Sequence, residues 1–293
     1  MKLVKPSVEL LEQKPKLQGV FDAISMAAST CYQSLPKDSK SAQRFVDTLI
    51  MNGHTAMLEF GAIYLVFPIT SYMYEYGAKK DYHGAKKYIN DPYSKTFVIE
   101  QDDKVYVTTN YRVIIENHWE QDLRYMSEPT EYHYKRHTAR FVISIGTGRE
   151  FTRHRHFSFA QESTRYCNYS KDKFNNEVTF IIPSWAEGTG EGQYDYPLRP
   201  DEVSASEYIF SYACYEAEKF YLDLLNNASC TPQQAREVLP LATKTVLCMS
   251  GFESDWRAFF DLRLRGTTGA PHPDAKYCAE MLHNKFKEIG IDL

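Results

Sequence analysis

The chain lacks long hydrophobic runs. No apolar stretch in its 293 residues approaches the ~20 residues that a helix needs to cross a membrane. The amino terminus, Met1 to Pro6, also contains no apolar stretch of the kind found in signal peptides. We therefore expect a cytoplasmic protein with no membrane partner.

Cysteine pairs and metal-binding motifs are also missing. The six cysteines are scattered and form no Cys-x-x-Cys pair, which argues against both a disulfide framework and a zinc site. His154 and His156 lie two residues apart, but no Cys, Asp or third His nearby completes a metal shell. We expect no bound metal ion, and we expect most of the cysteines to be small buried residues.

Two further absences concern nucleotides and nucleic acids. Gly146 and Gly148 form a Gly-x-Gly pair without the third glycine of the Gly-x-Gly-x-x-Gly motif, so a dinucleotide would not lie on a Rossmann turn. The formal net charge is −4, and there are no runs of Lys and Arg. Both features argue against a nucleic-acid partner.

The hydrophobic patterning predicts an α+β fold with a central sheet and flanking helices. We expect one domain over residues 1–293, because no internal repeat or linker divides the chain, with an inserted subregion at about 68–138. The expected strands are 62–67, 96–100, 104–108, 140–145 and 178–182. The expected helices are 41–53, 201–226, 253–265 and 273–289, with two more that begin near residue 116 and at Thr231-Pro232.

The most informative segment runs from Arg153 to Tyr166. It begins with Arg153-His154-Arg155, and if residues 160–166 are extended, Gln161, Ser163 and Arg165 face one side. Guanidinium groups match phosphate oxygens in pairs, and amides and hydroxyls can bind a sugar or a base. The alternative for an isolated basic triplet is a solvated helix face. The polar tail favours a nucleotide site.

This segment resembles the signature of the flavin-dependent thymidylate synthases, in which Arg-His-Arg is followed after seven residues by Ser. Gly53-His54 with Glu59, and later 235–240 and Leu262-Arg263, resemble three further segments of the family in the same order. The resemblance implies a family-specific fold and a single catalytic domain. It also implies a homotetramer with active sites shared between subunits, FAD as cofactor, and dUMP, methylenetetrahydrofolate and NADPH as substrates.

The resemblance also implies the roles of individual residues. Arg263 would be catalytic, because in the family this Arg binds the pyrimidine of dUMP and helps to ionise its N3. The residues expected to bind dUMP are Glu150, Arg153, Gln161, Ser163, Arg165, Arg236 and Arg263. The residues expected to bind FAD are His54, Arg153, His154, Arg155 and Gln161.

Arg263 also stands out without the resemblance. Trp256, Phe259, Phe260 and Arg263 follow the i, i+3, i+4, i+7 spacing, so the charge falls on the apolar face of a helix. A buried guanidinium is costly unless it is paired. Either a carboxylate of the chain or a ligand must therefore neutralise it.

Several positions depart from the family pattern. Glu150 stands where the family usually has Gln, and Ser254 and Ala258 stand where Asn and Arg usually contact flavin. Two alternatives therefore stay open: a nucleic-acid-binding module that uses the arginines and tyrosines, and a homologue that binds nucleotide but has lost flavin.

Overall fold

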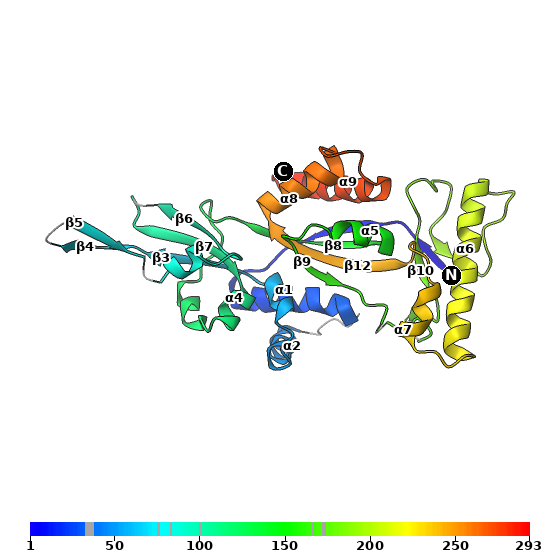
Figure 1. Cartoon of the computed structure of the whole chain (residues 1–293), viewed down its shortest axis with the longest axis horizontal. Coiled ribbons are helices and arrows are strands. Elements are labelled where there is room, and N and C mark those ends of the chain that lie inside the picture. The colour runs from blue at the N-terminus through cyan, green and yellow to red at the C-terminus, as the bar shows by residue number, and fades with distance from the viewer. Residues whose placement is uncertain (33–37, 75–76, 83, 100, 166, 172–173) are drawn as a thin grey trace.

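A four-stranded sheet lies at the centre of the computed structural model, which describes residues 1–32, 38–74, 77–82, 84–99, 101–165, 167–171 and 174–293 (Figure 1). Its strands follow the order β2 (Ser7–Leu11), β8 (Arg136–Ser144), β12 (Lys244–Phe252) and β9 (Ser158–Gln161), and each neighbouring pair is antiparallel. Helices α8 (Glu253–Phe260) and α9 (Pro273–Glu288) lie on one side and α1 (Lys16–Tyr32) on the other.

The central sheet is buried because helices pack on both of its faces. In β8 the buried residues alternate, with Ala139, Phe141 and Ile143 facing the core shared with α8 and α9. In β12 almost every residue is buried, so this strand forms an apolar run without alternation.

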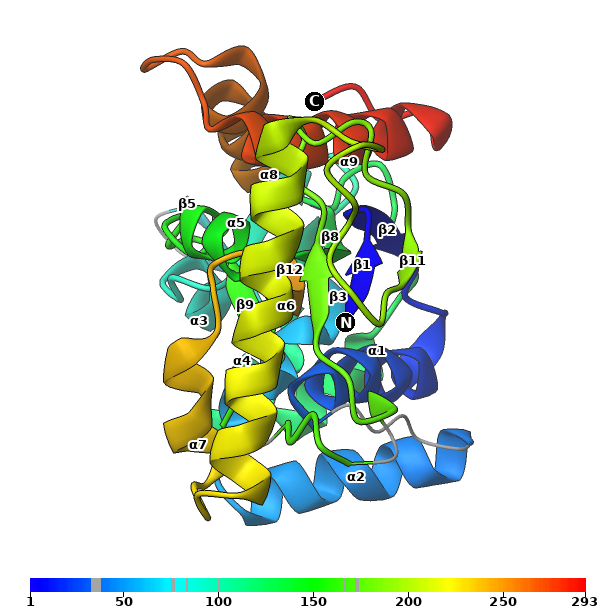
Figure 2. The ribbon, with the colours of Figure 1, turned by 90° about the vertical axis from the view of Figure 1, so that its right-hand side faces the viewer.

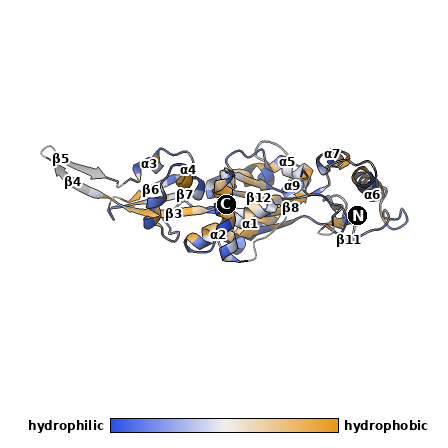
Figure 3. Ribbon diagram, turned by 90° about the horizontal axis from the view of Figure 1, so that it is seen from below, coloured by the Kyte–Doolittle hydropathy of each residue, from blue (hydrophilic) through white to orange (hydrophobic). Residues whose placement is uncertain are grey.

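A second sheet forms one end of the molecule. Its antiparallel strands follow the order β3 (Ala62–Pro68), β7 (Lys104–Asn110) and β6 (Lys95–Ile99), and β3 is drawn mainly in the hydrophobic colour in Figure 3. The hairpin of β4 (Thr70–Tyr74) and β5 (Gly77–Asp81) extends beyond it (Figure 1). The remaining elements of this end are α2 (Ser39–Met51), η1 (Thr55–Phe60), α3 (Lys86–Ile89), α4 (Tyr111–Glu116) and η2 (Glu120–Tyr125).

A third, smaller sheet forms the opposite end. Its strands follow the order β10 (Thr179–Ile181), β1 (Lys2–Val4) and β11 (Gly192–Gln193), and β1 pairs with β10 in parallel. The long helix α6 (Ala205–Asn226) runs beside this sheet, as Figure 2 shows from that end. The chain then continues through α7 (Pro232–Ala235) and η4 (Arg236–Val238) into β12.

The predicted α+β class is confirmed, and the mainly antiparallel pairing differs from that of a Rossmann fold. The strand expected at 62–67, the hairpin around 101–103 and the strand at 178–182 are confirmed to within a few residues. The helix expected at 41–53 is α2, which Gly53 follows with a φ of 69° in the left-handed region. The helices expected at 201–226, 253–265 and 273–289 are also present.

One local prediction was wrong, the extended segment at 160–166, and two others gave an element of the right type with different bounds. The helix expected from residue 116 onward lies at 111–116, because the Asn110 side chain caps it by accepting from the Val113 N–H. The strand expected at 140–145 begins at Arg136, and Gly146 and Gly148 lie inside helix α5 (Ile145–Phe151). The extended segment expected at 160–166 ends at Gln161, and Tyr166 lies outside the described residues. The domain boundary at about 68–138 stays a prediction.

Candidate active site

Arg263 is held by the chain's own side chains. It lies in the π-helical turn η5 (Asp261–Arg265), one turn beyond the buried Phe259 and Phe260. Its Nη1 donates to the Glu150 carboxylate at 2.8 Å, and its Nη2 donates to the Glu150 carbonyl at 2.5 Å. The predicted position on an apolar helix face is confirmed, and a carboxylate of the chain neutralises the charge.

His154 completes this cluster as a neutral acceptor. The Nε of Arg263 donates to Nε2 of His154 at 2.9 Å, which requires that nitrogen to carry no proton. Burial and the neighbouring Arg263 charge lower the pKa of His154 to about 4. The ring also packs against Phe259, with 5.1 Å between the ring centroids.

A cavity of about 490 Å³ gathers three of the predicted substrate-binding residues, Gln161, Ser163 and Arg236. Strand β9 ends at Gln161, whose amide donates to the Thr245 hydroxyl at 3.3 Å. Arg236 follows α7 and donates to the Thr164 hydroxyl at 3.3 Å. Segments far apart in the sequence thus bring an amide, a hydroxyl and a guanidinium to one cavity.

The extended geometry predicted for this segment fails after Gln161. The Glu162 N–H still bonds the Val246 carbonyl of β12, but the Ser163 hydroxyl then accepts the Arg165 N–H at 3.3 Å, and the chain turns at 164–165. Arg165 is exposed and does not line the cavity. A side-chain bond to a local N–H therefore replaces strand pairing here.

The remaining predicted residues lie at the surface. The side chains of Arg153 and Arg155 are exposed, and neither has an ion pair with any described residue. His54 is exposed where η1 begins, and its side chain makes no capping hydrogen bond there. The structure brings none of these three into the cavity that holds Gln161, Ser163 and Arg236.

Two lining residues were missed by sequence reasoning. Arg149 lines the cavity from α5, the helix that also carries Glu150. The sequence does hold a sign of this helix: Ser144 is a typical N-cap residue, and its hydroxyl accepts the Thr147 N–H. Glu162 is the other, and its buried carboxylate pairs with Lys244 at 2.6 Å. Only the pairing of β9 with β12 brings these two segments together.

The Arg263 cluster and the cavity beside Arg236 both lie within a segment that is shared with known proteins. A family model described as thymidylate synthase complementing protein matches residues 135–289. The chain belongs to this family. The resemblance inferred from the arginine motif is therefore confirmed.

The curated relatives of this family member have matching names. A probable flavin-dependent thymidylate synthase of Paramecium bursaria Chlorella virus 1 is 28% identical over 161 residues, which are 52% of this chain and 68% of the relative. The flavin-dependent thymidylate synthase of Corynebacterium glutamicum is 30% identical over 135 residues, 41% of this chain and 46% of the relative. The chain thus spans less than half of this second relative.

Solved structures with related names are more distant. The UMP/dUMP methylase PolB from Streptomyces cacaoi, bound with 5-Br dUMP, gives a TM-score of 0.43 at 17% identity, with coverage of 98% of this chain and 93% of that one. Thymidylate synthase X from Helicobacter pylori, with FAD and dUMP, gives a TM-score of 0.36 at 17% identity over 51% of this chain and 66% of that one.

The described residues include neither a helix suited to crossing a membrane nor a cluster of metal-binding side chains. Within them, no helix combines the length and apolar character that a membrane span requires. The same part of the chain contains no group of three or more His, Cys, Asp or Glu side chains arranged to hold a metal ion.

Proposed function

We propose that this protein is a flavin-dependent thymidylate synthase that methylates dUMP to dTMP. Methylenetetrahydrofolate would supply the carbon, FAD would be the cofactor and NADPH the reductant. The observation that carries the proposal is that the family match over 135–289 covers both the Arg263 cluster and the cavity beside Arg236. We also propose one catalytic domain over residues 1–293 with an insertion at about 68–138, and a homotetramer with shared active sites.

The cavity has the chemistry that dUMP requires. The guanidinium groups of Arg149 and Arg236 can bind phosphate oxygens in pairs, and both line the cavity. The Gln161 amide and the Ser163 hydroxyl can hydrogen-bond the sugar or the base edge. We assign Ser163 to binding rather than to nucleophilic attack, because its hydroxyl already accepts an N–H and no base activates it among the described residues.

Arg263 would act through its fixed positive charge. A guanidinium beside the pyrimidine stabilises negative charge as it develops on the ring, without any proton transfer by the arginine itself. Because Glu150 holds two guanidinium nitrogens, dUMP must displace this carboxylate or share Arg263 with it. His154 keeps the guanidinium in place from the Nε side.

The donor set at residues 153–155 fits an anionic cofactor. Arg153 and Arg155 are exposed guanidinium groups without a carboxylate partner in the described chain, so they would hold the phosphates of FAD or its electron-rich ring edge. His54, His154 and Gln161 stay predicted FAD contacts. When bound, FAD would supply the hydride that reduces the transferred carbon.

The test is tritium release from dUMP labelled at ring carbon 5, with FAD, NADPH and methylenetetrahydrofolate present. Wild-type protein should release tritium. Arg236→Ala should raise the KM for dUMP by roughly tenfold or more, because a charge-assisted pair with phosphate is lost. An absence of release from a flavin-loaded wild-type sample would refute the activity.

The pairing of Glu150 with Arg263 favours one alternative, a homologue that binds nucleotide but has lost flavin. A carboxylate already neutralises the charge that would activate the pyrimidine. Separate measurements of bound flavin, from the visible spectrum, and of dUMP affinity, by calorimetry, distinguish the two. Nucleotide binding by a colourless protein that cannot be loaded with FAD would identify the alternative.

A further inference from the structure

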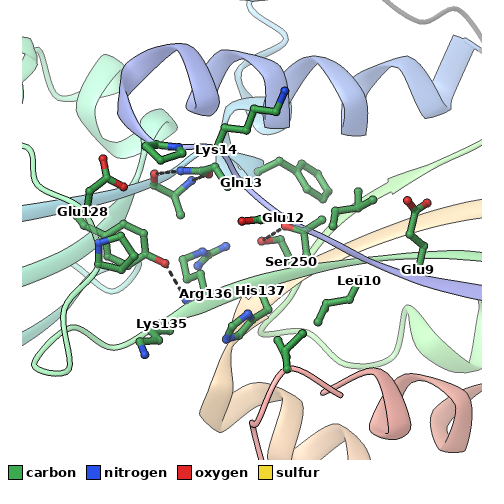
Figure 4. A pocket seen from close by; sticks show the side chains of 18 of the residues that line it. Glu9, Leu10, Glu12, Gln13, Lys14, Glu128, Lys135, Arg136, His137 and Ser250 are labelled. Carbon is green, nitrogen blue, oxygen red and sulfur yellow. Dashed lines mark hydrogen bonds between the residues drawn. The ribbon is translucent and has the colours of Figure 1, made fainter. Parts of the chain in front are cut away.

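A second cavity, of about 710 Å³, lies between the central sheet and the β3–β7–β6 sheet (Figure 4). Its walls come from β2 and the segment that follows it, from the first residues of β3 and β8, and from the end of α9. It shares no lining residue with the cavity beside Arg236. It is therefore a separate candidate site.

Most of the wall is apolar. Aliphatic and aromatic side chains from four segments face the space, and they favour a ligand with a flat or compact apolar body. These side chains are Leu10, Leu11, Phe60, Tyr64, Met126 and Ile289.

Arg136 is one of several charged residues of this wall, and its guanidinium has few acceptors. Its Nε is shut off from solvent without a hydrogen-bond partner, and Nη1 has no acceptor among the described residues. Nη2 contacts only the Glu59 carbonyl at 3.5 Å and the Ser158 hydroxyl at 3.4 Å, both at the limit of a hydrogen bond.

Two carboxylates, Glu59 and Asp255, act on Arg136 through their charge, but neither forms an ion pair with it among the described residues. Glu59 accepts from Arg112 on one oxygen and from Ser158 on the other, each at 2.6 Å. The Phe252 ring, 4.9 Å from the guanidinium carbon, provides a weak cation–π contact. Burial lowers the pKa of Arg136, so the surroundings oppose its charge. An anion bound in the cavity would supply the acceptor oxygens and the negative charge that the described chain does not place beside Arg136.

Other charged side chains of both signs line the cavity as well: the four lysines Lys14, Lys16, Lys135 and Lys285 and the four glutamates Glu9, Glu12, Glu128 and Glu288. Lys14 and Lys135 line the cavity, and neither forms an ion pair within the described chain. Glu12 is exposed and also lines it, and its carboxylate is not within ion-pair distance of Arg136 (Figure 4). Glu12 would repel an anion bound at Arg136.

We propose that this cavity binds a small apolar acid, a molecule with a flat hydrophobic body and one anionic group. The anionic group pairs with Arg136, and the body packs against the apolar wall. This cavity shares no lining residue with the proposed dUMP site, so a test of acid binding does not depend on whether the protein is a thymidylate synthase.

Calorimetry on the full chain tests the proposal with two probes, naphthoate and its neutral isostere naphthamide. Wild-type protein should bind naphthoate at least about tenfold more tightly than naphthamide, because only the acid pairs with the guanidinium. Equal affinity for the two probes, or no binding of naphthoate, overturns the proposal.

Variants locate the bound acid. Arg136→Gln should weaken naphthoate binding about tenfold or more. The control Arg199→Gln changes an exposed arginine outside the cavity, and it should leave binding unchanged. Arg236→Gln should also have no effect. Weakening by either control places the acid elsewhere and overturns the proposal.

A second variant, which is expected to tighten binding, tests the proposal if Arg136→Gln fails to fold. Glu12→Gln changes an exposed side chain and removes a negative charge from the cavity, so naphthoate should bind several-fold more tightly and naphthamide should be unaffected. Unchanged or weaker naphthoate binding by Glu12→Gln overturns the proposal.

Discussion

Glu150 is the residue on which the proposed chemistry depends most directly. Its side chain and its carbonyl together occupy both terminal nitrogens of Arg263. A guanidinium held in this way is well positioned, but the carboxylate competes with any negative charge on a pyrimidine.

Replacement of this carboxylate should favour the nucleotide. We expect Glu150→Gln to lower the dissociation constant for dUMP by roughly three- to tenfold, because an amide can still accept from Arg263 without neutralising its charge. Calorimetry measures the change, and Glu202→Gln is the control, since it removes a carboxylate from an exposed pair with Arg199. Unchanged affinity would show that Glu150 does not compete.

His154 should make stability depend on pH. Its folded pKa of about 4 lies below the ordinary value of 6.5, so between these values the unfolded chain binds a proton that the folded chain does not. Its contribution to the free energy of unfolding is therefore complete above pH 6.5 and is lost as the pH falls to about 4. We expect this contribution to be roughly 1–3 kcal/mol.

Urea denaturation between pH 4 and 7 checks this expectation. His154→Gln should make the slope of stability against pH shallower. It should not abolish the slope, because burial also lowers the pKa of His133. An identical slope in wild type and variant would contradict the assignment.

At the scale of single elements, α5 links the two parts of the site. Arg149 lines the cavity while the next residue, Glu150, holds Arg263. The helix has only seven residues, so the Ser144 cap is a large part of what defines it.

Loss of that cap should affect binding as well as stability. We expect Ser144→Ala to cost about 1 kcal/mol of unfolding free energy and to weaken dUMP binding, because Arg149 and Glu150 lose their fixed positions. Ser204→Ala removes the equivalent cap from α6 and should cost a similar amount without an effect on dUMP. Denaturation and calorimetry on both variants make the comparison. Equal effects on binding would contradict the role of α5.

At the scale of the whole molecule, Glu59 links the central sheet to the end of the molecule that holds β3, β7 and β6. Its carboxylate bonds Arg112 of α4 and Ser158 of β9, which places the second sheet against the central one. Both contacts cross between parts of the chain that are distant in sequence.

We expect Glu59→Gln to lower the free energy of unfolding by roughly 1–2 kcal/mol, because two charge-assisted bonds between the sheets are weakened. Glu116→Gln is the matched control, since Glu116 bonds the same Arg112 and also the Thr55 hydroxyl of η1, but has no bond to the central sheet, so its loss should cost less. Hydrogen exchange would show where the loss occurs. Faster exchange confined to α4 in both variants would exclude a linking role for Glu59.

Local signals in the sequence predicted much of this molecule. Gly53 after a helical stripe, Thr231-Pro232 before one, and the turn at 101–103 each gave the right element because one or two residues decide them. The apolar face of Trp256, Phe259 and Phe260 likewise placed Arg263 correctly. The arginine motif sufficed to identify the family.

What the sequence could not decide is which partner each charged side chain finds, because this depends on contacts across long separations. Arg263 meets Glu150 over 113 residues, and Arg112 meets Glu59 over 53. Only the tertiary structure separates the cavity residues Gln161, Ser163 and Arg236 from the exposed Arg153, Arg155 and Arg165. Periodicity specifies which face a residue lies on, whereas the packing of distant segments decides whether a charge on that face is paired, buried or open to a ligand.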